Sequence, residues 1–345
     1  MDRTKARKVI GSAGIAIALL FPTVALADED GVSFWLPGLF GSLAAVPQAA
    51  PGWSFLTFSY DTDVSAGADV ARARSIRIGR FDPTVGASLS ADLDANVALQ
   101  WIQPNYAFAT PVLGGQATVG LGGYFGHNDT DLDGTVTATV GPIVAERKFN
   151  VDSSLTGFGD LYPIGMLKWH DGVNNYMVYA TGDIPVGAYD PKRLANLGIG
   201  HGAIDGGVGY TYLNPENGYE FSIVSGLTGN FENTDTDYTS GIDWHTDWGA
   251  SKFLSKQLFV GLVGYVYDQI SPDSGSGDRV GAFESRVIGV GPQLGYLFPV
   301  GEHTQGYMNL KGYKEFDEAH RPGGVNIWLT FAFSPAAPET TSARD

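Results

Sequence analysis

The sequence predicts an all-β fold, a transmembrane antiparallel up-and-down β-barrel. Three observations favour it. Apolar and polar residues alternate along many segments, the connections between these segments are short and long in turn, and no apolar run after residue 27 is long enough for a spanning helix. Only a closed barrel then pairs every backbone group inside a bilayer. A soluble β-sandwich, the alternative, gives no reason for such regular connections.

The last hairpin, Tyr307 to Phe333, alternates most clearly. Its final arm has apolar residues at spacing two, which are Val325, Ile327, Leu329, Phe331 and Phe333. In a barrel of this kind the apolar face meets lipid and the other face meets the lumen. We therefore expect Leu329 and Phe331 to contact acyl chains and Thr330 to face the lumen.

The strand count follows from the same pattern. Nine strands run from about Leu155 to the end of the last hairpin, and five more precede them: Trp53–Asp61, Arg74–Leu89, Val97–Phe108, Ala117–Phe125 and Thr135–Arg147. The first estimate is therefore 14 strands. If Thr135–Arg147 is only an extracellular excursion, the count falls to 12, because a barrel with both termini in the periplasm needs an even number.

The first 27 residues have the features of a secretory signal peptide. Basic residues come first, an apolar run from Val9 to Phe21 follows, and Ala25-Leu26-Ala27 supplies a small-residue cleavage site. We expect a mature chain that begins at Asp28 and a location in the bacterial outer membrane.

Residues 28–52 form a second region, the barrel is expected over residues 53–333, and residues 334–345 are expected to be a disordered tail. Residues 31–52 are apolar and uncharged, with three prolines that interrupt any regular strand or long helix. Two interpretations stay open for this stretch: a loosely packed amino-terminal lead, or a plug inside the barrel.

Charge and composition exclude several classes of partner. The chain has 21 Lys and Arg against 37 Asp and Glu. Loss of residues 1–27 removes four basic residues and Asp2, which leaves 17 against 36 and a net charge of −19. Such a charge argues against nucleic acid as a partner. The chain has no cysteine, so disulfides and cysteine-bound metals are excluded.

Several motifs together carry a family resemblance. They are Ser33-Phe-Trp-Leu-Pro-Gly-Leu-Phe-Gly-Ser-Leu-Ala-Ala45, Gly157-Phe-Gly-Asp-Leu-Tyr162, Leu194-Ala-Asn-Leu-Gly198 and Asn309-Leu-Lys-Gly-Tyr313. With them the chain resembles the outer-membrane protein family of the meta-cleavage pathway of phenol degradation. The resemblance implies a transporter-like barrel that passes small, often aromatic or hydrophobic compounds. One departure is that the chain continues beyond Phe333, whereas many such barrels end at an aromatic residue.

Two polar clusters have residue types that can bind metal ions. Asp129, Asp131 and Asp133 match the start of a calcium loop, but Val140 occupies the position of the required bidentate glutamate, which favours an acidic surface turn. Asp243, His245 and Asp247 share one strand face, where metal binding or acid–base chemistry is possible. A polar inner wall near the extracellular mouth is the favoured interpretation, so no metal, cofactor or catalytic residue is predicted.

The predicted function is a channel or transporter for uptake of small hydrophobic or aromatic compounds. The motifs Gly-x-Ser-x-Gly and His-Glu-x-x-His are both absent, so no enzyme is predicted. A barrel hydrolase of lipids or esters and a structural or adhesive barrel remain the alternatives. Lumen-facing charge is expected at Arg77, Asp243, His245, Asp247, Lys311 and Glu315. The expected partners are outer-membrane lipid, lipopolysaccharide, the barrel-assembly machinery and a small solute.

Overall fold

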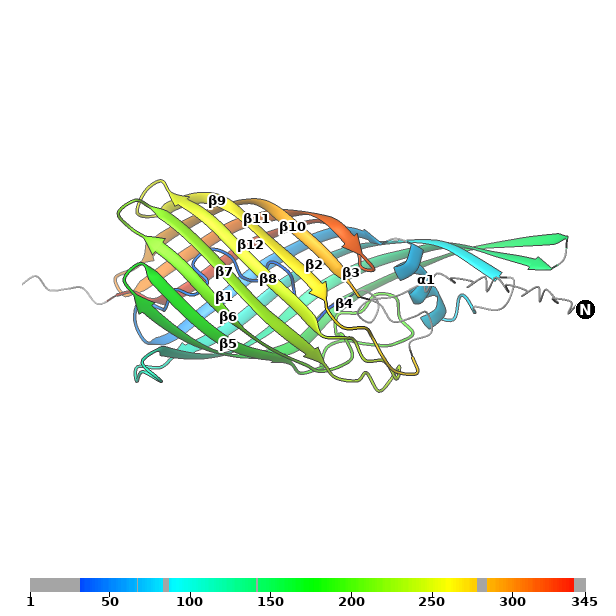
Figure 1. Cartoon of the computed structure of the whole chain (residues 1–345), viewed down its shortest axis with the longest axis horizontal. Coiled ribbons are helices and arrows are strands. Elements are labelled where there is room, and N and C mark those ends of the chain that lie inside the picture. Colours follow the sequence, from blue (N-terminus) through cyan, green and yellow to red (C-terminus); the bar gives the residue numbers. More distant parts are fainter. Residues whose placement is uncertain (1–31, 67, 83–86, 141, 278–283, 338–345) are drawn as a thin grey trace, which may run out of the picture.

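The computed structural model describes residues 32–66, 68–82, 87–140, 142–277 and 284–337. The expected signal peptide and most of the expected tail lie outside these residues. Within them the chain forms one closed antiparallel barrel with a short helix near one end (Figure 1). The strands are β1 (Gly52–Ala66), β2 (Ala87–Ala107), β3 (Gln116–Val140), β4 (Ile143–Asp171), β5 (Asn174–Asp183), β6 (Ala203–Asn214), β7 (Tyr219–Asn230), β8 (Asp243–Phe253), β9 (Leu258–Gln269), β10 (Arg286–Val300), β11 (Thr304–Ala319) and β12 (Gly323–Pro335), and the helix is α1 (Ala68–Arg77).

Each strand pairs with the next one in the sequence, and β12 closes the barrel on β1, where Phe55 lies opposite Phe333. This confirms the up-and-down barrel. The described residues form twelve strands, which is the alternative count and not the first estimate of fourteen.

Two of the fourteen expected strands do not exist as separate elements. Arg74–Leu89 was expected to be one strand, but Ala68–Arg77 is helical and Ala87 begins β2. Alanine and arginine favour a helix, and α1 buries Val70 and Ala71 against the sheet. Thr135–Arg147 is split between the end of β3 and the start of β4, which form one long hairpin.

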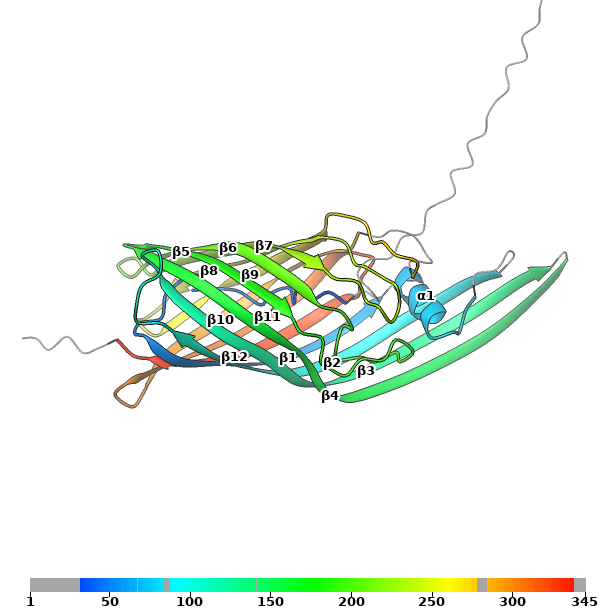
Figure 2. The same cartoon turned by 90° about the horizontal axis from the view of Figure 1, so that it is seen from below.

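Strands β2, β3 and β4 extend well beyond the other strands at one end of the barrel (Figure 2). The helix α1 packs on this extension, where Val70 joins Leu93 and Leu132 in a small apolar cluster. The connections at this end include the long ones, residues 184–202, 231–242 and 270–285; we call it the loop end. At the opposite end, the turn end, the connections are short, for example residues 215–218 and 254–257.

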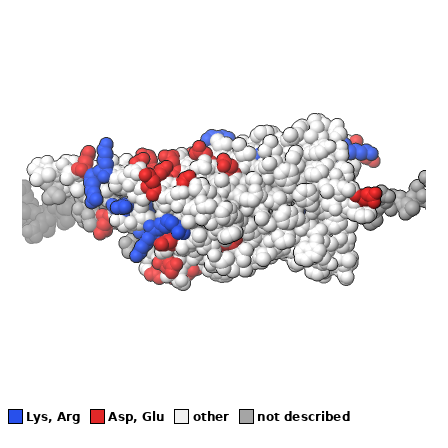
Figure 3. Space-filling view, turned by 180° about the vertical axis from the view of Figure 1, so that it is seen from behind, with Lys and Arg blue, Asp and Glu red and all other residues white. Residues whose placement is uncertain are grey.

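The outer surface is apolar in its middle part. Figure 3 shows few charged residues there, whereas charges gather mainly over the loop end. A row of neighbouring side chains on β9 to β11 illustrates the pattern, since Val260, Leu294 and Leu310 are 38%, 38% and 43% exposed. Next to Leu310 on the same strand, Asn309 and Lys311 are buried in the interior. An apolar outside with a polar inside is the arrangement of a membrane barrel, not of a soluble sandwich.

Among the described residues, no helix has the length and apolar character needed to cross a bilayer.

Candidate functional site

Residues 32–51, which we call the inner segment, run through the interior of the barrel before β1 begins (Figure 1). Several of its side chains are buried among those of the barrel wall: Phe34 is 6% exposed, Trp35 2% and Ala45 0%. The segment has no regular secondary structure, as its prolines predict. Its backbone groups therefore need partners from the barrel wall.

Asp247 on β8 supplies one such set of partners. Its carboxylate accepts hydrogen bonds from the backbone N–H groups of Gly38 (2.9 Å) and Phe40 (3.0 Å). Gly38 has a φ of +90°, and an added Cβ would lie only 3.1–3.2 Å from the rings of Tyr313 and Tyr265. Glycine is thus required for the bend that directs both N–H groups at one carboxylate. Lys311 on β11 completes the contact by donating to the carbonyl of Gly38.

Glu220 on β7 holds the segment further along. It accepts hydrogen bonds from the Ser42 hydroxyl (2.6 Å) and from the backbone N–H of Leu43 (2.9 Å). Lys168 on β4 donates to the carbonyl of Ala44 at 2.7 Å, from another side of the barrel. Charged groups of the wall therefore pair with backbone groups of the segment, and such charge-assisted bonds are the stronger kind.

Asp243, His245 and Asp247 all point inward and are at most 1% exposed, but they do not converge on one point. His245 stacks on Trp35 of the inner segment, with ring centroids 3.6 Å apart and planes at 14°. Its Nε2 lies 2.8 Å from Asp205 on β6. Asp243 instead accepts a hydrogen bond from Asn230 at 2.9 Å. No group of three possible metal ligands forms within the described part of the chain.

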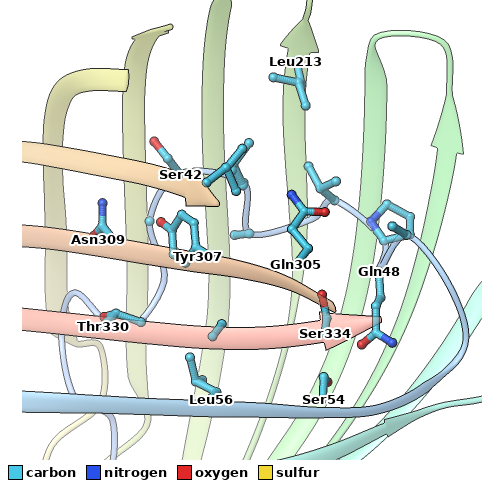
Figure 4. A pocket seen from close by; sticks show the side chains of 18 of the residues that line it. Ser42, Gln48, Ser54, Leu56, Leu213, Gln305, Tyr307, Asn309, Thr330 and Ser334 are labelled. Atoms are coloured by element: carbon cyan, nitrogen blue, oxygen red, sulfur yellow. The ribbon is translucent and has the colours of Figure 1, made fainter. Parts of the chain in front are cut away.

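Two cavities lie inside the barrel, one on each side of the inner segment. The cavity at the turn end has a volume of about 870 Å³, and Figure 4 shows Ser42, Tyr307, Asn309 and Thr330 around it. The cavity at the loop end is smaller, about 250 Å³. Leu39 and Phe40 of the inner segment line both cavities and so form the partition between them.

Aromatic rings form one part of the wall of the loop-end cavity, beside aliphatic side chains. Trp101 on β2 is central, with its ring centroid 4.9 Å from that of Tyr162 on β4 and 6.1 Å from that of Tyr124 on β3. Phe34 of the inner segment stacks on Tyr162 at 5.6 Å. That these rings lie together was not predicted from the sequence. The inward position of Trp101 within an alternating strand was the available signal.

The charged residues that were predicted to face the lumen lie in three different parts of the barrel interior. Arg77 and Glu315 line the loop-end cavity, and Lys311 lines the turn-end cavity. Asp243, His245 and Asp247 belong to the wall beside the inner segment. Arg77 lies on α1 and not on a strand, which corrects its expected setting.

The acidic triplet Asp129, Asp131 and Asp133 lies on β3 and does not form a loop. Its regular pairing with β4 leaves no turn that could wrap a calcium ion. Beside it, His127 contacts Thr156 Oγ1 through Nδ1 (2.6 Å) and Asp129 Oδ2 through Nε2 (2.9 Å). This exposed hydroxyl–imidazole–carboxylate group was not anticipated from the sequence.

A family model described as "Putative MetA-pathway of phenol degradation" matches residues 54–331. The chain belongs to this family. Among solved structures, the barrel is similar to an outer membrane channel from Pseudomonas putida F1, with 12% identity, a TM-score of 0.52, and coverage of 84% of this chain and 96% of that one. A FadL homologue from Pseudomonas aeruginosa also matches, with 9% identity, a TM-score of 0.40, and coverage of 92% and 99%.

The likeness to the Pseudomonas putida channel shows that this member of the phenol-degradation family has the fold of an outer-membrane barrel. No curated protein sequence matches the chain.

Proposed function

We propose that this barrel is an outer-membrane channel through which small hydrophobic or aromatic compounds enter the cell. The observation that carries the proposal is the ring-lined cavity at the loop end, behind which a second cavity opens to the turn end. Apolar rings bind well to other rings in offset or edge-to-face contact. Membership of a family linked to phenol degradation adds support from an independent direction.

The two cavities suggest a route with two stages. A volume of about 250 Å³ suits a compound of one ring, since cavities of about 150 Å³ already hold benzene. The compound would then pass Leu39 and Phe40, which separate the cavities, and reach the wider and more polar one. This step requires a displacement of the inner segment, which under this proposal acts as a plug.

The orientation and the cellular partners belong to the same proposal. Short turns of bacterial barrels face the periplasm, so the turn end is the inner side and the long loops face outward, toward lipopolysaccharide. Folding would depend on the barrel-assembly machinery. Export would depend on the signal peptide, and amino-terminal sequencing of protein from outer membranes is expected to begin at Asp28. A sequence that begins at Met1 would contradict export by cleavage.

The group of Thr156, His127 and Asp129 is the specific observation in favour of a barrel hydrolase. Acyl transfer also needs donors for the oxyanion, usually backbone N–H groups that are free to bind it. Around this group β3 and β4 pair without interruption from Gly126 to Asp133, so the ladder already uses the backbone groups between the two strands. The channel is therefore the better supported function. Hydrolysis of p-nitrophenyl esters is expected to be absent and unaffected by His127→Ala.

The channel proposal predicts that Trp101 contributes to uptake. Trp101→Ala removes a ring that is 7% exposed and lines the loop-end cavity, so binding of phenol should weaken about tenfold. Uptake of radiolabelled phenol into liposomes that contain the refolded protein is the measurement. Trp53→Ala is the matched control, because Trp53 is 70% exposed on the outer face of β1. Equal uptake by all three proteins would contradict the proposal.

A further inference from the structure

The loop-end cavity carries an excess of positive charge inside a strongly acidic protein. Among the described residues that line it, the charged ones are Arg74, Arg77, Arg321 and Glu315. The whole chain has a net charge of −16, so its long-range field does not attract anions. A local concentration of arginine beside aromatic rings therefore points to a ligand that is recognised at close range.

Arg321 has the clearest unused binding capacity. It lies in the turn between β11 and β12, and its Cζ is 4.5 Å from the ring centroid of the fully buried Tyr267. This stacking holds the guanidinium by its face and leaves its N–H edge for hydrogen bonds. Yet Nε and Nη1 are both buried and have no hydrogen-bond partner in the part of the chain that the structure describes. Buried donors of this kind are usually satisfied, so a ligand is the expected acceptor.

The carboxylate of Glu315 is already engaged by other donors. Its Oε1 accepts a hydrogen bond from the Tyr265 hydroxyl at 2.6 Å, and its Oε2 accepts one from the backbone N–H of Gly324 at 2.8 Å. It forms no ion pair with Arg321 within the described residues. Glu315 therefore leaves the guanidinium edge of Arg321 unoccupied.

The other two arginines of the cavity wall come from α1. Arg74 and Arg77 are three residues apart on α1, which places them on one side of the helix. Arg74 donates to the carbonyl of Leu194 at 2.9 Å, which ties α1 to the loop between β5 and β6. The positive charge on this side of the cavity is therefore carried by a helix whose position is fixed by a hydrogen bond to the neighbouring loop.

We propose that the loop-end cavity binds a small aromatic carboxylate, with Arg321 contacting the carboxylate and Trp101 and Tyr162 contacting the ring. The assignment rests on the proposed function and narrows its solute to an anionic class. A guanidinium matches a carboxylate with two parallel hydrogen bonds, which a neutral alcohol cannot form. The cavity volume limits the ligand to about one ring.

The test compares benzoate with benzyl alcohol, which has the same ring and no charge, by equilibrium dialysis at pH 7 against the full chain refolded in detergent. The wild-type protein should bind benzoate at least tenfold more tightly than benzyl alcohol. Arg321→Gln should weaken benzoate binding about 10- to 100-fold and leave benzyl alcohol unchanged. Arg286→Gln is the control, since Arg286 is exposed and pairs with Asp317 at 3.1 Å.

The outcomes separate the two proposals. If neither compound binds, the ring-binding channel itself is contradicted. If benzyl alcohol binds and benzoate binds no better, or if Arg321→Gln leaves the preference intact, only the carboxylate site is overturned. Different migration of boiled and unboiled samples verifies that each variant is folded. Should Arg321→Gln fail to fold, Arg321→Lys replaces it, because lysine cannot form the two parallel hydrogen bonds, and an unchanged preference in that variant would likewise overturn the site.

Discussion

Single charged residues of the wall fix the inner segment, and Asp247 is the clearest of them. It lies opposite Gly38 and Phe40, whose N–H groups have no other acceptor within the irregular segment. The alternation along β8 was enough to predict that Asp247 faces inward. Its contact with Gly38 could not be predicted, because Gly38 and Asp247 are 209 positions apart and no local sequence pattern relates them.

At this scale we predict that Asp247→Ala loosens the partition between the cavities. The substitution leaves two N–H groups without an acceptor, which costs about 1–3 kcal/mol for each one that stays buried. The inner segment should therefore shift, and single-channel conductance in planar bilayers should rise several-fold. Asp317→Ala, which removes an exposed carboxylate at the loop end, is the control. A conductance equal to that of the wild-type protein would show that Asp247 does not hold the partition.

At the scale of elements, alternation predicted the strands from β5 to β12 well and the region before them less well. Most of these later strands have one apolar face and one face that is polar or small, so their period is visible; β9 differs, since its inner face carries Phe259, Val263 and Tyr265. In that earlier region α1 packs on the extended ends of β2 and β3, where Val70, Leu93 and Leu132 share one apolar cluster. Burial there follows the contacts between α1 and β2 to β4, so the helix and the single long hairpin were not evident from the period alone.

The same alternation predicts which face of β12 meets lipid. Leu329 pairs with the outward Leu310, whereas Thr330 lines the turn-end cavity. Leu329→Arg should destabilise the folded barrel by about 2–4 kcal/mol, the cost of arginine near the middle of the lipid face. Thr330→Arg should cost much less, because water and polar neighbours in the cavity can solvate the charge. Urea titrations of both variants in lipid vesicles measure the difference, and equal destabilisation would refute the assignment of the two faces.

At the scale of the whole molecule, the hydrogen bonds that close the barrel are distinct from those that hold the inner segment. The barrel closes through the backbone ladder between β1 and β12, which begins at Phe55 and involves no residue of the inner segment. The segment contacts the wall mainly through side chains of the barrel, such as Glu220 and Lys168. The sequence left open whether this stretch was a lead or a plug, because its apolar composition suits both.

The final prediction concerns removal of the inner segment between Ser33 and Pro47. The barrel should still fold, because its ladder is complete without these residues, and the charges left in the lumen can be hydrated. Boiled and unboiled samples of the deletion variant should therefore still migrate differently in detergent gels. Since Leu39 and Phe40 separate the two cavities, their loss should join them and raise conductance at least tenfold. A deletion variant that shows no heat-dependent migration would mean that the segment is needed for barrel assembly. A folded variant with wild-type conductance would mean that the partition lies elsewhere in the lumen.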